Sequence, residues 1–184
     1  MITKKETALR NIREGKPKTH IWSKELQSDR ELVLEAVKQS GLVLEYVSEE
    51  LKGDREVVLA AVENNFWALK FASEILRNDK EVVLTAISKR SGYALRFASK
   101  ELRNDKNIIL AAISKNGCAL SYASDRLRSD RHIAFAAVTE NGDALKYVSD
   151  ELKNDRDVVL NAIGQNPSAL KYASPELQKQ FSLH

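Results

Sequence analysis

The sequence predicts an all-α fold, an α-solenoid of tandem two-helix repeats of about 25 residues. Two observations carry this prediction. A motif of this length recurs along the 184-residue chain, and each copy holds a long apolar run, a stop such as Asn-Gly, and a shorter apolar segment. The composition favours helices, because only seven Gly and three Pro accompany many Ala, Leu, Val, Lys and Glu residues.

We expect a single repeat domain over residues 1–184 with three parts. Residues 25–175 hold six repeats whose apolar faces are covered only when neighbouring repeats stack. Residues 1–24 fit the same frame, but Thr7 and Asn11 stand where later repeats have apolar residues. This degenerate repeat is therefore predicted to cap the N-terminal end, and the tail 176–184 to cover the other end.

The first helix of each repeat has a predicted start at a small polar residue or Gly. An Asp follows each time, where the helix dipole favours an anion, and an acidic residue often stands three positions after the cap, as in a capping box. Asn-Gly, as in Asn116-Gly117 and Asn141-Gly142, then favours a helix C-terminus with a C-cap glycine. The predicted N-caps are Ser28, Gly53, Asn78, Asn104, Ser129 and Asn154.

The second helix carries Ala-Leu-x-aromatic-Ala-Ser, so one aromatic residue recurs in each repeat. Its Leu and Ala neighbours favour a core position, with the tyrosine hydroxyls at the rim. The alternative is a platform on which nucleic-acid bases stack. The six residues of this aromatic column are Tyr46, Phe71, Phe97, Tyr122, Tyr147 and Tyr172.

The motif also resembles a known family. Leu102-Arg103-Asn104-Asp105-Lys106 and the segment Asn116 to Ser124 (Asn-Gly-Cys-Ala-Leu-Ser-Tyr-Ala-Ser) resemble the repeats of domain of unknown function 4116. The resemblance covers residues 25–175. It implies a helical repeat fold and no activity, since none is assigned to the family. The pairing of a longer with a shorter helix is similar to leucine-rich repeat variants at the level of the fold.

No residue pattern points to catalysis, a cofactor or a metal. His20, His132 and His184 share no helical face, and Cys118 is the only cysteine, which rules out an intramolecular disulfide. Neither a nucleophile elbow nor a phosphate-binding loop is present. We therefore expect a protein that is not an enzyme.

The chain also lacks the marks of a membrane or secreted protein. No apolar run reaches the roughly 20 residues that span a bilayer, and the N-terminus has no apolar signal core. A reducing, cytoplasmic location is expected, although a specialised secretion route would leave no mark in such a sequence.

Charge leaves a nucleic-acid alternative open. The net charge is +3, but residues 1–24 carry seven basic and two acidic residues, which leaves the other 160 residues near neutrality. Basic columns recur in the repeats, but Asp and Glu columns lie one or two residues away, so a surface of ion pairs is the better interpretation. The residues that would anchor nucleic acid are Lys4, Lys5, Arg10, Arg13, Lys16 and Lys18.

Partner-binding residues are predicted at positions that do not repeat. The residue near the start of the second helix is Leu42, Trp67 and Tyr93 in the first three repeats and polar in the last two, and Phe66 adds to this group. Such large apolar residues either anchor a partner or tuck between repeats.

A second variable column lies on the outer face of the first helix. Its small residues would let a partner chain approach closely, whereas a solvated helix face is the alternative. The residues of this column that are predicted to contact a partner are Thr85, Ser88, Ser114 and Thr139. The resulting hypothesis is a protein-interaction module, acting as an adaptor, scaffold or stoichiometric inhibitor, whose partner and oligomeric state the sequence does not specify.

Overall fold

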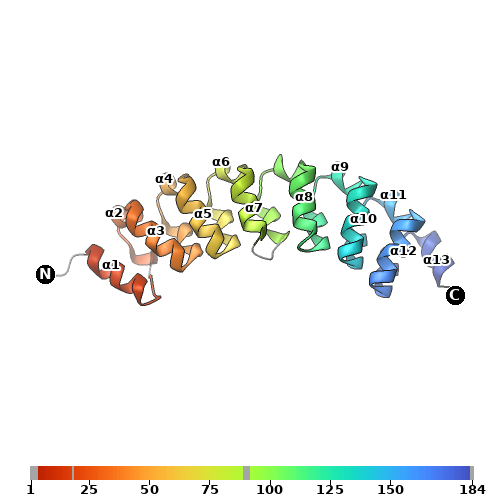
Figure 1. Cartoon of the computed structure of the whole chain (residues 1–184), viewed down its shortest axis with the longest axis horizontal. Coiled ribbons are helices and arrows are strands. Elements are labelled where there is room, and N and C mark those ends of the chain that lie inside the picture. The colour runs from red at the N-terminus through yellow and green to blue at the C-terminus, as the bar shows by residue number, and fades with distance from the viewer. Residues whose placement is uncertain (1–3, 18, 89–91, 183–184) are drawn as a thin grey trace. The chain divides into compact units, whose positions relative to one another are not determined.

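Repeated helices account for the regular structure of the chain. The computed structural model describes residues 4–17, 19–88 and 92–182, and within these ranges all regular secondary structure is helical (Figure 1). The chain forms two compact units, Met1–Lys89 and Arg90–His184. Each unit is a stretch of α-solenoid, as the sequence predicts.

Each repeat contains three helical elements rather than the two that the sequence predicts. The long helices of the first unit are α1 (Lys4–Arg13), α3 (Arg30–Gln39), α5 (Arg55–Asn64) and α7 (Lys80–Ser88). Those of the second unit are α8 (Lys106–Ile113), α10 (Arg131–Glu140) and α12 (Arg156–Gln165).

The predicted second helix is a 3-10 helix. In the first unit these helices are η1 (Thr19–Ile21), η2 (Gly41–Tyr46) and η3 (Phe66–Phe71). In the second unit they are η4 (Gly92–Phe97), η6 (Gly117–Tyr122), η7 (Gly142–Tyr147) and η8 (Pro167–Tyr172).

A short helix then completes the repeat. Its copies are α2 (Lys24–Gln27), α4 (Glu49–Lys52), α6 (Glu74–Arg77), η5 (Leu102–Asn104), α9 (Asp125–Arg128), α11 (Asp150–Lys153) and the longer terminal α13 (Pro175–Phe181).

Stacking builds two layers inside each unit. In the first unit α5 packs between α3 and α7, while η3 packs on η2. In the second unit α10 packs between α8 and α12, and η6 and η7 lie between η4 and η8. We call these the long-helix layer and the 3-10 layer.

The core lies between the two layers. Helix α5 illustrates the pattern, since Val57, Val58, Ala61 and Val62 are fully buried while the rest of the helix is not. Helices η3, η4, η6 and η7 each add a buried Ala-Leu pair, and every short helix except α2 adds one buried leucine, such as Leu76. Apolar burial of this kind is the main stabilising term of a repeat stack.

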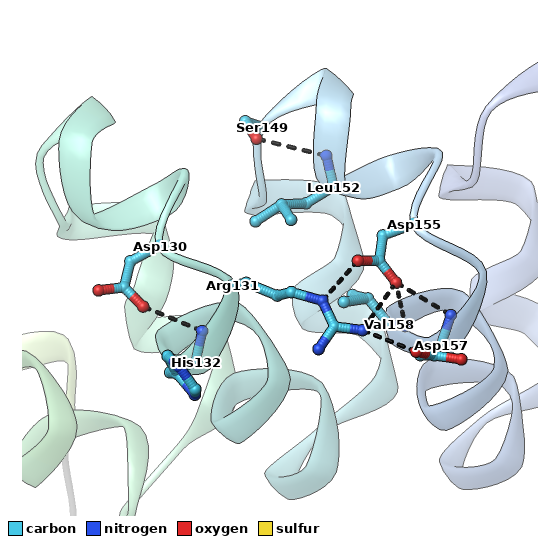
Figure 2. Close-up of polar contacts among 8 residues, drawn as sticks. All are labelled: Asp130, Arg131, His132, Ser149, Leu152, Asp155, Asp157 and Val158. Atoms are coloured by element: carbon cyan, nitrogen blue, oxygen red, sulfur yellow. Dashed lines mark hydrogen bonds and ion pairs between the residues drawn. The ribbon is translucent and has the colours of Figure 1, made fainter.

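The N-caps of the long helices lie one residue later than predicted. Asp155 caps α12, because its Oδ1 accepts hydrogen bonds from the backbone N–H of Asp157 at 3.0 Å and of Val158 at 3.2 Å (Figure 2). Asp29, Asp54, Asp105 and Asp130 do the same in their repeats. The predicted cap residues instead end the short helix, as Asn154 does for α11. A four-residue helix shows no periodicity in sequence, so the polar residue that ends it resembles the start of the next helix.

Within each unit, ion pairs connect each long helix to the following one. The Arg131 guanidinium donates to Asp155 Oδ2 at 2.6 Å and to Asp157 Oδ2 at 2.7 Å (Figure 2). Equivalent pairs join Arg30 to Asp54 at 2.7 Å and Lys106 to Asp130 at 3.2 Å. The prediction that this basic column forms ion pairs with neighbouring acids is confirmed. The same Asp therefore caps its own helix and ties it to the preceding repeat.

These pairs predict a loss of stability in acid. Hydrogen bonds from Arg131 and Arg30 are the largest cause that lowers the pKa of Asp155 and Asp54 below the ordinary value near 3.8. A lowered folded-state pKa means that the stabilisation is present above about pH 4 and is lost as the pH falls through the folded-state pKa. We expect the urea midpoint to be flat above about pH 5 and to fall below about pH 4.

Asp155→Asn is the informative variant for this prediction. Asn still accepts the capping hydrogen bonds but carries no charge for Arg131, so the fall in acid should become shallower. An unchanged acid profile in this variant would show that the inter-repeat pairs do not control it.

Candidate interaction surface

An asparagine cap followed by glycine begins the 3-10 helices η6 and η7. The Asn116 side-chain oxygen accepts from the backbone N–H of Cys118 at 2.9 Å, and Asn141 does the same for Asp143 at 2.9 Å. The glycine that follows does not serve as a left-handed C-cap, because among the described residues only Gly15 has a positive φ. A Cβ on Gly117 would lie 2.2 Å from the Ala137 carbonyl oxygen. Glycine is therefore present because the 3-10 helix lies directly against the next long helix.

The aromatic column is not core, contrary to the prediction. Tyr46 is exposed and the other five members are half-buried. A 3-10 helix has three residues per turn, so Gly117, Leu120 and Ala123 face inward and leave Tyr122 on the flank of the helix. The column consequently lines the outer surface of the 3-10 layer in each unit.

Lysine side chains accompany these rings. The Lys171 ammonium lies 4.8 Å from the centroid of the Tyr172 ring, and that of Lys146 lies 5.7 Å from the Tyr147 ring. In the first unit Lys70 lies 5.3 Å from the Phe71 ring. Such cation–π contacts hold the ammonium groups over the rings, so the surface combines apolar area with positive charge.

The four apolar residues predicted to bind a partner lie on this layer. Leu42, Trp67 and Tyr93 are 41%, 46% and 48% exposed, and Phe66 is half-buried with its ring centroid 5.6 Å from that of Trp67. Leu42, Phe66 and Trp67 belong to the first unit. Tyr93 belongs to the second, where its ring meets Tyr122 edge-on at 6.2 Å. Their role in binding stays a prediction.

The four small polar residues lie on the other layer. The hydroxyls of Ser88, Ser114 and Thr139 each donate to a carbonyl of their own helix at 2.8 Å, and Thr85 supplies one of those carbonyls. Thr139 also accepts from the Asn161 amide at 2.6 Å. These hydroxyls are thus used within and between repeats, and the structure does not bring them together with the aromatic column.

Sequence reasoning missed a second set of exposed apolar residues. Leu84, Phe135 and Leu160 are partly exposed on the long-helix layer, and Ile75 on α6 is 82% exposed. The sequence contains a signal for the exposure of Leu84, Phe135 and Leu160. Buried residues of a long helix follow an i, i+1, i+4, i+5 pattern, and each of these three residues stands at i+2, outside that pattern.

Two grooves interrupt the surface of the second unit, each with a volume of about 300 Å³. Lys100, Arg103 and Tyr122 line the first groove. Residues Arg128, Lys146, Tyr147 and Lys153 line the second groove. Burial raises the pKa of Tyr147 above its ordinary value, so its phenol stays a neutral donor.

Other chemistry of the described residues is sparse. No group of three or more His, Cys, Asp or Glu side chains within the described ranges could hold a metal ion. Cys118 is half-buried, and desolvation followed by the charge of Asp143 raises the pKa of its thiol. In the part of the chain that the structure covers, no helix has the length and apolar character to cross a membrane.

The comparisons with known proteins support the repeat assignment. The profile of the domain of unknown function DUF4116 matches residues 20–52, 54–91, 88–128 and 130–178, which together span most of the chain. No curated protein and no solved structure gives a significant match. The matched segments follow one another in tandem and cover well over half of the chain, so the chain belongs to the DUF4116 family.

Proposed function

We propose that this protein is a non-enzymatic interaction module, an adaptor, scaffold or stoichiometric inhibitor, which binds a protein partner on its 3-10 layer. The observation that carries the proposal is the aromatic column, which is left at least partly exposed in every repeat from Tyr46 to Tyr172. Burial of these rings between repeats would stabilise the fold, so their exposure has no folding benefit. Aromatic side chains are also the commonest anchors of protein interfaces.

Features of the same layer favour protein over nucleic acid as the partner. Base stacking needs free ring faces, whereas Lys146 and Lys171 lie over the rings of Tyr147 and Tyr172. Carboxylates such as Asp143 also stand among the aromatic residues and would repel phosphates.

One of the basic N-terminal residues is already paired within the chain. Lys5 is engaged by Asp29 at 2.7 Å and by Glu31 at 3.5 Å, so its charge is already balanced. Lys18 lies outside the described residues. Nucleic-acid binding therefore remains the alternative function.

Truncation of the exposed apolar residues tests the proposal. We expect Trp67→Ala and Tyr93→Ala to weaken capture of the natural partner by about thirtyfold each, with a melting temperature close to that of the wild type, because interface anchors contribute about 2 kcal/mol or more. Quantitative capture from native lysate, followed by titration of the identified partner, measures the effect.

Leu160→Ala is the matched control, since it removes a similarly exposed apolar side chain from the long-helix layer. Binding that is lost in Leu160→Ala but kept in both aromatic variants would contradict the proposed face. A steep loss of binding with added salt, and recovery of nucleic acid in the captured fraction, would instead support the alternative.

A further inference from the structure

The two grooves of the second unit are one site repeated twice. Arg103 and Arg128 occupy the same position in successive repeats, as do Tyr122 and Tyr147. Each groove lies between a short helix and a 3-10 helix, and pairs the Arg with the Tyr. A ligand that follows the stack therefore meets the same side chains again one repeat later.

In the second groove two cations are more sheltered than the carboxylates with which they pair. In the second groove the Arg128 side chain is 36% exposed, whereas its partner Asp125 is 92% exposed. Lys153 is 26% exposed and pairs with Asp150, which is 97% exposed, at 2.8 Å. Asp125 and Asp150 can therefore release their partners at little cost. Arg128 and Lys153 would then be available to bind an anion in the groove.

Arg103, which lines the first groove, has one donor atom without an acceptor. The Nε atom of Arg103 is buried and has no hydrogen-bond partner in the described structure. A buried N–H without an acceptor is unfavourable, and a carboxylate is the acceptor that a guanidinium binds best, with two parallel hydrogen bonds. The described chain supplies no acceptor for this donor, and a modest shift of the Arg103 side chain would expose it to a carboxylate in the groove.

We propose that these grooves bind an extended acidic polypeptide segment of the partner, with one carboxylate in each groove, an inference that rests on the proposed function of the 3-10 layer. The spacing supports an extended chain. Packed helical repeats lie about 8–10 Å apart. In a polyproline II segment, residues i and i+3 point to the same side and are separated by about 9 Å. Glutamates three residues apart would therefore enter successive grooves.

Charge density distinguishes this ligand from a nucleic acid. The first groove is lined by two cations and one carboxylate, and the second by three cations and two carboxylates. This modest positive excess suits isolated carboxylates. A strand with a phosphate on every nucleotide would place further negative charge against Asp125 and Asp150.

The experiment measures fluorescence anisotropy of a labelled peptide of repeated Glu-Pro-Ala triplets with the full chain. We expect it to bind at least about tenfold more tightly than the same peptide with Gln for Glu, since charge-assisted hydrogen bonds are lost. A third peptide of equal composition, in which the glutamates are adjacent, should also bind more weakly, because it cannot fill both grooves.

The protein variants locate the binding site. Arg103→Gln with Arg128→Gln should reduce binding of the Glu peptide to the level of the Gln peptide. Tyr147→Phe, which keeps the ring and removes only the hydroxyl, should weaken it several-fold. Lys115→Gln removes one exposed charge that lines neither groove and should leave binding unchanged. Melting curves check that each variant folds. If the double variant does not fold, the result for Tyr147→Phe decides the test.

Equal binding of the Glu and Gln peptides, equal weakening by Lys115→Gln, or preference for a labelled oligothymidine over the Glu peptide would each overturn the inference. The proposed function fails separately. If Trp67→Ala and Tyr93→Ala abolish capture of the natural partner while no acidic peptide binds, the 3-10 layer is still the protein-binding surface and only the acidic ligand is wrong.

Discussion

Gly117→Ala is expected to destabilise the second unit by about 3 kcal/mol or more, although it adds a single methyl group. The new Cβ would lie 2.2 Å from the Ala137 carbonyl oxygen and 3.0 Å from the Asn141 backbone nitrogen. Both atoms belong to the backbone, so no side-chain rotation can relieve the clash. The variant must separate η6 from α10 and open the contact between two repeats.

Gly164→Ala provides the control within the same unit. Gly164 lies inside α12, and no atom beyond its chain neighbours and the nearby backbone of its own helix would stand within 4 Å of an added Cβ. Ala should therefore stabilise this helix by about 0.5–1 kcal/mol, since Gly loses more backbone entropy on folding. Urea titration followed by far-ultraviolet circular dichroism should show opposite shifts for the two variants. Similar small shifts in both would mean that close packing does not explain the glycine at position 117.

Much of the fold could be predicted because the repeat is long and regular in sequence. The 25-residue period and the apolar run identify the long helices, and their stacking follows from the need to cover that run. The starts of those helices could not be fixed, because Asn154 and Asp155 are both good caps and stand next to each other. Only the structure shows that Asn154 ends α11 and that Asp155 begins α12.

The candidate surface was predictable only in part. The column of Trp67 and Tyr93 varies between repeats, which predicts a surface position, and both residues are exposed. The sequence predicts a core position for Tyr147 because it neighbours Ala144 and Leu145, which are fully buried. The sequence pattern does not separate an α-helix from a 3-10 helix at this length, and the angular position of the ring depends on that difference. The grooves depend on which short helix lies beside which 3-10 helix, and that information is absent from a local motif.

The α6 helix offers the second test with a large expected effect, because two adjacent apolar residues there have opposite environments. Leu76 is 6% exposed and Ile75 is 82% exposed. Leu76→Ala should destabilise the first unit by about 2–5 kcal/mol, through lost apolar burial and the cavity left behind. Ile75→Ala removes a side chain that is already in water and should change stability by no more than about 0.5 kcal/mol.

Tryptophan fluorescence reports on the unit that contains these residues, because Trp22 and Trp67 are the only tryptophans and both belong to it. A urea titration followed by this signal should therefore show a lower midpoint for Leu76→Ala and an unchanged midpoint for Ile75→Ala. Equal effects would mean that the short helices do not fix the repeats, and that α6 could detach without loss of the core. A lower midpoint for Leu76→Ala alone would instead show that the buried leucine holds α6 against the long-helix layer. Short helices placed in the same way form one wall of each groove in the second unit.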